Sequence, residues 1–163
     1  MSTSNSTGTA IMSKRAEASR ALTLNVTLVD MARLRGHERT DETRLNALKA
    51  EIESDGMLFR PIVVDEETDV VLDGHHRLAA LKLLGCSRIP VCYVSYASDS
   101  IGVMSMLKGL KITKSMVVQA GLREDPFPPK TTWHYLNSNS RTLNHISCIQ
   151  RRVDVPLKRL RQG

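Results

Sequence analysis

The chain has 163 residues, of which 41% are hydrophobic and 25% charged, and its formal net charge at pH 7 is +6. This length and balance are typical of one folded domain that is large enough for its own core. No apolar run approaches the roughly 20 residues of a membrane-spanning helix, and no charged-then-apolar secretory signal opens the chain. We therefore expect a cytoplasmic protein with no membrane partner.

The N-terminal segment differs in composition from the rest. Residues 1–20 are mostly small and polar, so we expect them to be disordered and the folded domain to occupy residues 21–163. Basic residues among the serines resemble an organellar transit peptide, but Glu17 and the lack of an amphipathic pattern favour the cytoplasm. The cysteines are odd in number and lack metal-ligand spacing, so we expect reduced thiols without a chemical role: Cys86, Cys92 and Cys148.

The first half of the domain predicts a strand, a polar loop and a helix. Apolar and polar residues alternate over 24–29, and residues 35–41 form a polar loop. A helix is predicted over 41–54, ending at Asp55-Gly56, because apolar residues recur at intervals of three and four: Leu45, Leu48 and Ile52.

The next elements are a hairpin, a helix and a strand. Residues 61–65 and 70–72 are β-branched runs around a polar turn, which predicts a hairpin. A helix follows with an apolar face that stops at Gly85, and residues 89–94 predict another strand. Residues 98–118 are rich in methionine and other apolar side chains, which we interpret as core packing.

The junction between the hairpin and its helix gathers chemically active side chains: Asp73, Gly74, His75, His76 and Arg77. The first N–H groups of a helix lack intrahelical partners and attract anions, so this junction predicts a phosphate-binding turn. A turn with a solvated, capped helix end explains the same residues. The two adjacent histidines do not face each other on a helix, which argues against a metal site built from them.

A second polar cluster follows a proline-rich turn: Lys130, Thr131, Thr132 and His134. We expect a helix to begin here and to present a cation, two hydroxyls and an imidazole to a small zwitterion. A capped helix with Trp133 packed on the core is the alternative.

These segments, taken in order, resemble the ParB/sulfiredoxin-like fold and, within it, the kinases of free L-serine. The resemblance covers roughly residues 24–160, and its anchors are His37-Glu38, 51–65, 73–77, 130–134 and 153–157. Sulfiredoxins carry their catalytic cysteine where this chain has His75, and ParB-type domains lack the Lys-Thr-Thr-x-His segment. The resemblance implies a single α/β (α+β) domain with a small mixed sheet and flanking helices.

The resemblance also implies an activity. A nucleotide, ADP or ATP, would give its terminal phosphoryl group to the hydroxyl of free L-serine, producing O-phospho-L-serine, a precursor of cysteine in the family. The family's catalytic glutamate corresponds to Glu38, which would take the hydroxyl proton. Glu42 is a competing candidate because the spacing from this loop to Asp73 is a few residues short of the family pattern.

The remaining site residues follow from the same resemblance. Asp73 is implied as a catalytic carboxylate that binds or anchors Mg²⁺, although it could instead be only a helix N-cap. Gly74, His75, His76 and Arg77 would bind the nucleotide phosphates, and His75 would also stabilise the transferring group. The serine would contact Lys130, Thr131, Thr132 and His134.

Two alternatives to the kinase remain at this stage. A ParB-like nucleotide- or nucleic-acid-binding module without kinase activity would use the same turn and the basic C-terminal region, but an aromatic content of 4% leaves little for base stacking. The second alternative is a regulatory protein that binds nucleotide and serine without turnover. Where the kinases are expected to carry an aromatic residue near the substrate, this chain has Met104 and Met106, so the acceptor's identity stays open.

Overall fold

Five short strands, four of them rich in β-branched residues, form a mixed sheet in the order β1-β6-β4-β5-β2. Their bounds are β1 (Val26–Asp30), β2 (Arg35–Gly36), β4 (Ile62–Asp65), β5 (Val70–Asp73) and β6 (Arg88–Val94). Strand β4 runs antiparallel to β5 and parallel to β6, while β1 is antiparallel to β6 and β2 is parallel to β5. The predicted hairpin is therefore confirmed, and it forms part of the central sheet.

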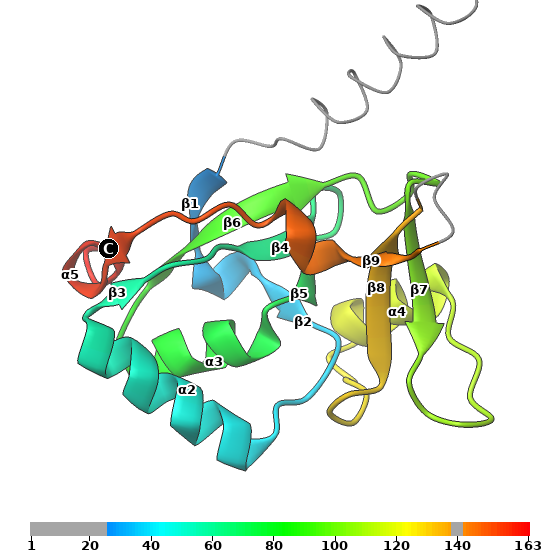
Figure 1. The fold of residues 1–163 in the computed structure, drawn as a ribbon, viewed down its shortest axis with the longest axis horizontal. Helices are drawn as coiled ribbons and strands as arrows, with labels where there is room; N and C mark the ends of the chain where they lie inside the picture. The colour runs from blue at the N-terminus through cyan, green and yellow to red at the C-terminus, as the bar shows by residue number, and fades with distance from the viewer. Residues whose placement is uncertain (1–25, 138–141) are drawn as a thin grey trace, which may run out of the picture.

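The computed structural model describes residues 26–137 and 142–163 (Figure 1). The expectation of disorder over residues 1–20, and the first two residues of the strand expected over 24–29, lie outside this part of the chain.

Two helices lie against each other beside the central sheet (Figure 1). Helix α2 (Glu42–Asp55) begins at Asp41, whose carboxylate accepts from the Arg44 N–H, and ends at Gly56, which has a φ of 64°. Helix α3 (His75–Leu83) begins at Gly74, so the glycine itself caps the helix. The side chain of Asp73 makes no cap, which corrects the alternative that it serves only as an N-cap.

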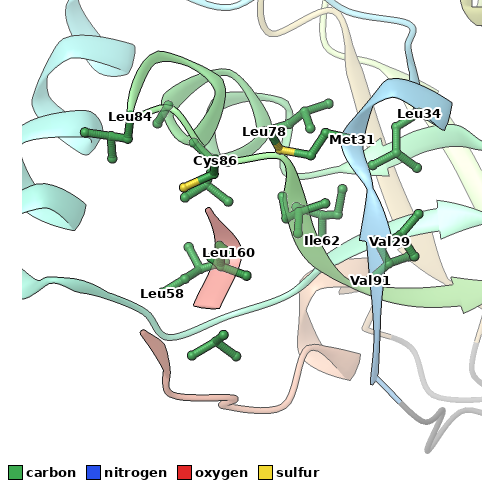
Figure 2. Close-up of a cluster of buried hydrophobic side chains, with 14 of the residues drawn as sticks. Val29, Met31, Leu34, Leu58, Ile62, Leu78, Leu84, Cys86, Val91 and Leu160 are labelled. Carbon is green, nitrogen blue, oxygen red and sulfur yellow. The ribbon is translucent and has the colours of Figure 1, made fainter. Parts of the chain in front are cut away.

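Both faces of the central sheet are covered. Ile62, Val64 and Val71 pack into one cluster with α3 and the C-terminal segment, as Figure 2 shows for Ile62, Leu78 and Leu160. Their neighbours along the strands point to the other face, where Val63, Val70 and Leu72 pack against residues of α4 (Lys114–Leu122). A strand that is buried on both faces has a continuous run of apolar residues, which explains the sequences of β4 and β5.

A second sheet of three strands stands next to the first in Figure 1, in the order β7-β8-β9. Its strands are β7 (Ile101–Ser105), β8 (Thr132–Leu136) and β9 (Asn144–His145). The prediction that a helix begins near Lys130 was wrong, because Thr132–Leu136 is a strand paired antiparallel with β7. Threonine and aromatic residues favour a strand over this segment, and pairing with β7 outweighs the local capping signal.

The remaining elements are short. A two-residue strand, β3 (Met57–Leu58), pairs with β10 (Val155–Pro156), and helix α5 (Leu157–Leu160) follows. Two 3₁₀ turns, η1 (Met31–Arg33) and η2 (Ile146–Ile149), complete the described chain. No helix among the described residues is long and apolar enough to cross a membrane.

The expectation that residues 98–118 serve only as core packing was partly wrong. Met116 packs against the second core cluster, but Met104 and Met106 are 36% and 57% exposed. Leu107 and Leu110 are exposed as well. Of the three cysteines, Cys86 and Cys92 are buried and Cys148 is exposed.

Candidate active site

A cleft of about 860 Å³ runs between α2 and the β5–α3 junction on one side and β8 and η2 on the other. It gathers nearly every residue that the sequence singled out: Glu38, Asp73, Gly74, His75, His76, Arg77, Lys130, Thr132 and His134. Thr131 and Glu42 are not part of its lining. The two polar clusters, more than 50 residues apart in the sequence, thus meet at one site.

Glu38 is fixed in the cleft by the segment that begins β8. Its carboxylate accepts hydrogen bonds from the N–H groups of Thr131 and Thr132, each at 3.2 Å, and from the Thr132 hydroxyl at 2.6 Å. Its backbone is held too, because Phe127 N–H donates to the His37 carbonyl and Arg39 N–H donates to the Phe127 carbonyl. These hydrogen bonds hold the loop and the Glu38 carboxylate in a defined position.

Thr131 contributes through its backbone. Its side chain is fully buried and its hydroxyl donates to the Pro128 carbonyl at 2.6 Å. The hydroxyl thus stabilises the proline-rich turn, so the expectation that it contacts substrate needs correcting. Lys130 adopts a φ of 59° and lines the cleft.

Three histidines lie close together at the cleft, where His75 and His134 line it and His37 contacts both of their rings. The ring of His37 makes edge contacts with those of His75 and His134, at centroid distances of 4.6 and 5.4 Å. His134 shares a hydrogen bond of 2.9 Å with the buried Tyr96 hydroxyl. Burial lowers the pKa of each of the three histidines, most strongly for His75 and His134, and mutual repulsion between the rings adds to the shifts of those two. The cluster therefore stays neutral near pH 7.

The histidines at the start of α3 each accept a hydrogen bond from the loop opposite. His75 Nε2 accepts from the His37 N–H at 3.1 Å, and His76 Nε2 accepts from the Asp41 N–H at 3.0 Å. In each neutral ring the proton must therefore be on Nδ1. Either ring can donate only that one N–H to a phosphate oxygen.

Arg77 is engaged within the protein. One guanidinium nitrogen donates to Asp73 Oδ2 at 2.9 Å, and the other donates to the Pro61 carbonyl at 2.6 Å and to the Gln150 side-chain oxygen at 3.0 Å. Gln150 in turn donates to Asp73 Oδ2. The guanidinium thus makes three hydrogen bonds within the protein, one of which holds Asp73, while Arg77 also lines the cleft.

The rest of the cleft combines cations with an apolar wall. Arg39, Arg44 and Arg60 line it beside Lys130, so a polyanion would meet positive charge on several sides. Apolar side chains from α2 and β3 form another part: Leu48, Ile52, Met57, Leu58 and Phe59. A ligand with a flat apolar end and a phosphorylated end fits this division.

Sequence reasoning missed several residues of the site. Gln150 and His145 line the cleft, and Tyr96 supports it from behind. Met106, expected near the substrate, and Trp133, considered only as a core residue, line it too. His37 was named only as a family anchor, without a role, and its ring bonds Thr132. Gln150 carried no signal in the sequence, because its contact with Asp73 joins residues 77 positions apart.

The mixed central sheet, the glycine-led helix and the cleft at their junction define a domain of the ParB/sulfiredoxin-like class. Residues 10–109 match the ParB N-terminal domain, and the chain belongs to that family. Both findings agree with the fold expected from the sequence.

Two curated relatives carry a more specific name. The chain is 36% identical over 87 residues to the ATP-dependent L-serine kinase of Desulfurococcus mucosus, covering 51% of this chain and 34% of the relative. It is 26% identical over 95 residues to the ADP-dependent L-serine kinase SerK of Thermococcus kodakarensis, covering 56% and 39%. The matched segment thus spans little more than a third of these relatives' length.

Solved structures show the same fold over more of the chain. A free serine kinase in complex with AMP superposes with a TM-score of 0.69 at 17% identity, covering 84% of this chain and 94% of that one. SbnI with a C-terminal truncation, from Staphylococcus aureus, gives a TM-score of 0.61 at 17% identity, covering 85% and 90%. At such identities the likeness concerns the fold alone.

Proposed function

We propose that this protein is a kinase of free L-serine that uses ADP or ATP and releases O-phospho-L-serine. The observation that carries the proposal is the Glu38 carboxylate, which two N–H groups and a hydroxyl hold in a cleft shared with Asp73 and a cationic lining. A hydroxyl is a weak nucleophile, and a fixed carboxylate can orient it and take its proton. The names of the curated relatives support the same activity.

The other residues divide between the two ligands. Gly74, His75 and His76 provide the helix-start N–H groups and the Nδ1 donors for nucleotide phosphates, and His75 stabilises the transferring group. Thr132 donates to Glu38, Lys130 and His134 line the same cleft, and the three form the amino-acid end of the site. Arg77 acts on the phosphates through Asp73, which it positions.

Asp73 fits a Mg²⁺ ion that arrives with the nucleotide. Its Oδ2 is bonded by Arg77 and Gln150, whereas Oδ1 lies 3.9 Å from His145 Nε2. No group of three or more His, Cys, Asp or Glu suited to a metal occurs within residues 26–137 and 142–163. Mg²⁺ commonly takes one or two carboxylates and fills its shell with phosphates and water, and when bound it neutralises phosphate charge.

The donor and the compartment belong to the same proposal. ADP and ATP both present a terminal phosphate to the α3 N-terminus, so either suits the cleft. We place the reaction in the cytoplasm, where nucleotides are supplied and the buried Cys86 and Cys92 stay reduced.

The test is to incubate the purified chain with L-serine, Mg²⁺ and either ADP or ATP. Formation of O-phosphoserine with the matching AMP or ADP establishes the activity and names the donor. If high enzyme concentrations give no product with either donor, the kinase proposal fails. A salt-sensitive affinity for DNA in that case would favour the ParB-like binding module.

The choice between the two candidate bases is a separate prediction. We expect Glu38→Gln to lower kcat by a factor of about 100 or more, because the amide cannot take a proton, while nucleotide affinity changes little. Glu42→Gln is the matched control, since Glu42 is in the first turn of α2 and outside the cleft lining. Steady-state kinetics that show the loss in Glu42→Gln instead would move the base to that residue.

A further inference from the structure

The side chains of Glu38, Thr132 and His37 form a continuous hydrogen-bonded chain. The Thr132 hydroxyl oxygen lies 2.6 Å from Glu38 Oε2 and 2.9 Å from His37 Nε2. The other ring nitrogen of His37, Nδ1, lies 2.6 Å from the Val71 carbonyl oxygen. The chain thus leads from the cleft to the backbone of β5 in the core.

A count of hydrogens shows that this chain is one proton short at rest. The Val71 carbonyl can only accept, so His37 Nδ1 carries the hydrogen, and Nε2 of the neutral ring is an acceptor. The Glu38 carboxylate is an acceptor as well. The Thr132 hydroxyl therefore has one hydrogen to offer to two acceptors, at 2.6 and 2.9 Å.

The surroundings of His37 keep its ring neutral near pH 7, so the hydrogen-bonded chain lacks one proton at rest. Its side chain is fully buried, and it faces the rings of His75 on α3 and His134 on β8 as well as the carboxylate of Glu38. Burial lowers its pKa, although the nearby Glu38 carboxylate and the Val71 carbonyl act in the opposite direction. The chain thus has room for one more proton, and the Val71 carbonyl and the Glu38 carboxylate partly offset the cost of placing it on His37.

We propose that Thr132 and His37 form a proton relay that shares with Glu38 the proton lost by the acceptor hydroxyl during phosphoryl transfer. This inference rests on the proposed kinase function. It assigns His37 a role in which it never contacts the substrate and acts only through Thr132 and Glu38.

The step balances without a further reactant. The acceptor's O–H bond breaks as its oxygen bonds to phosphorus, and the bond from phosphorus to the nucleotide oxygen breaks with its electron pair on the nucleotide. The proton reaches Glu38 Oε2, passes to the Thr132 oxygen, and the hydroxyl's own hydrogen moves to His37 Nε2. Every donor then has an acceptor: Nε2–H to Thr132, Thr132 to Glu38, and Nδ1–H to Val71. After product release the transfer reverses and Glu38 gives the proton to water.

The backbone contacts of Glu38 allow the relay to be cut selectively. Thr132→Val removes the hydroxyl but keeps the branched side chain and the N–H group that donates to Glu38, and the Thr131 N–H also remains. We expect kcat to fall by about tenfold to a hundredfold while KM for the nucleotide changes less than about threefold. Thr132→Ser, which returns a hydroxyl, should rescue most of the rate.

Kinetics in mixtures of light and heavy water separate a relay from a structural role. Two or more protons moving together give the parent a curved dependence of kcat on the deuterium fraction, and Thr132→Val should give a linear one. His37→Asn, which can still donate to Val71 but cannot hold the proton, should show the same linear dependence. The double variant of His37→Asn with Thr132→Val should have a kcat close to that of either single variant. A Thr132→Val enzyme that keeps the parent's kcat and curvature, or loses only affinity, would overturn the relay.

A measurement without turnover separates failure of the relay from failure of the proposed function. Nitrogen-15 NMR of the histidine rings should show His37 with its hydrogen on Nδ1, and Thr132→Val should lower the pKa of His37 by removing the acceptor for Nε2–H. A hydrogen on Nε2, or a pKa that Thr132→Val does not move, overturns the relay even if phosphoserine is formed. An absence of phosphoserine with the NMR pattern intact overturns only the kinase function.

Discussion

At the scale of single residues, Arg77 shows how a cleft side chain can be held in place by several protein acceptors. The sequence predicts a guanidinium at a phosphate-binding turn. In the structure this guanidinium spans Asp73, the Pro61 carbonyl and Gln150, which ties the β5–α3 junction to the start of β4 and to the end of η2. Lysine carries the same charge but has no planar fork to reach three acceptors.

Arg77→Lys should therefore destabilise the fold as well as weaken nucleotide binding. We expect the free energy of unfolding to fall by about 1–3 kcal/mol, because at least one buried acceptor loses its donor. Arg44→Lys is the control: Arg44 lines the same cleft from the first turn of α2, so its replacement should change unfolding by less than about 0.5 kcal/mol. Urea unfolding of both variants tests this, and equal stabilities would mean that Arg77 is not a structural support.

Some residues of the site could be predicted from the sequence, and others could not. Glu38, Asp73 and His76 could be named because each stands in a motif with recognisable order along the chain. The roles of Thr131 and Arg77 depend on which acceptor each side chain finds after folding: the Pro128 carbonyl for Thr131 and the Pro61 carbonyl for Arg77. Local sequence carries no information on such distant backbone partners.

At the scale of elements, the strand-to-helix junction depends on Gly74 for two reasons. Its φ of 104° lies in a region that side-chain-bearing residues rarely adopt. A Cβ atom at this position would also lie 2.3 Å from Cγ2 of Ile62 on β4. The glycine thus lets α3 start directly against the sheet, which places His75 and His76 at the cleft.

Gly74→Ala and Gly85→Ala form a matched pair that separates these two costs. Gly85 has a φ of 76°, but a Cβ there would meet no atom within 4 Å. We expect Gly85→Ala to lower the free energy of unfolding by about 1 kcal/mol from backbone strain, and Gly74→Ala to lower it by about 3 kcal/mol because a clash adds to the strain. Denaturant unfolding measures both, and similar losses would show that the contact with Ile62 relaxes at no cost.

The elements were predicted best where the pattern is local. The hairpin of β4 and β5, helix α2 and its Gly56 end follow from short-range periodicity and turn residues. Strand β8 was missed because Lys130-Thr131-Thr132 after a proline-rich turn looks like the start of a helix. Its pairing with β7, about 30 residues earlier, is a long-range interaction that a local pattern cannot reveal.

At the scale of the whole molecule, the histidines lie where the two sheets and α3 meet. His37 follows β2, His75 begins α3 and His134 is on β8, so closing the fold brings three rings together. His37 and His134 are almost completely buried, and burial lowers the pKa of all three below the ordinary histidine value. Folding therefore favours their neutral forms, whereas the unfolded chain lets each ring take a proton at its usual pKa.

This difference predicts that acid destabilises the fold in a defined range. The folded pKa values are depressed, so below about pH 6.5 the unfolded state binds more protons and stability falls as the pH falls. Each histidine that stays neutral in the folded state removes up to about 1.4 kcal/mol per pH unit. Above about pH 7.5 the rings are neutral in both states, so they should contribute no slope there. Urea unfolding at pH 8.0, 7.0, 6.0 and 5.5, with histidine titration followed by NMR, tests the expectation. Stability that holds constant or rises between pH 7.0 and 5.5 would show that the buried rings accept protons without opening the fold.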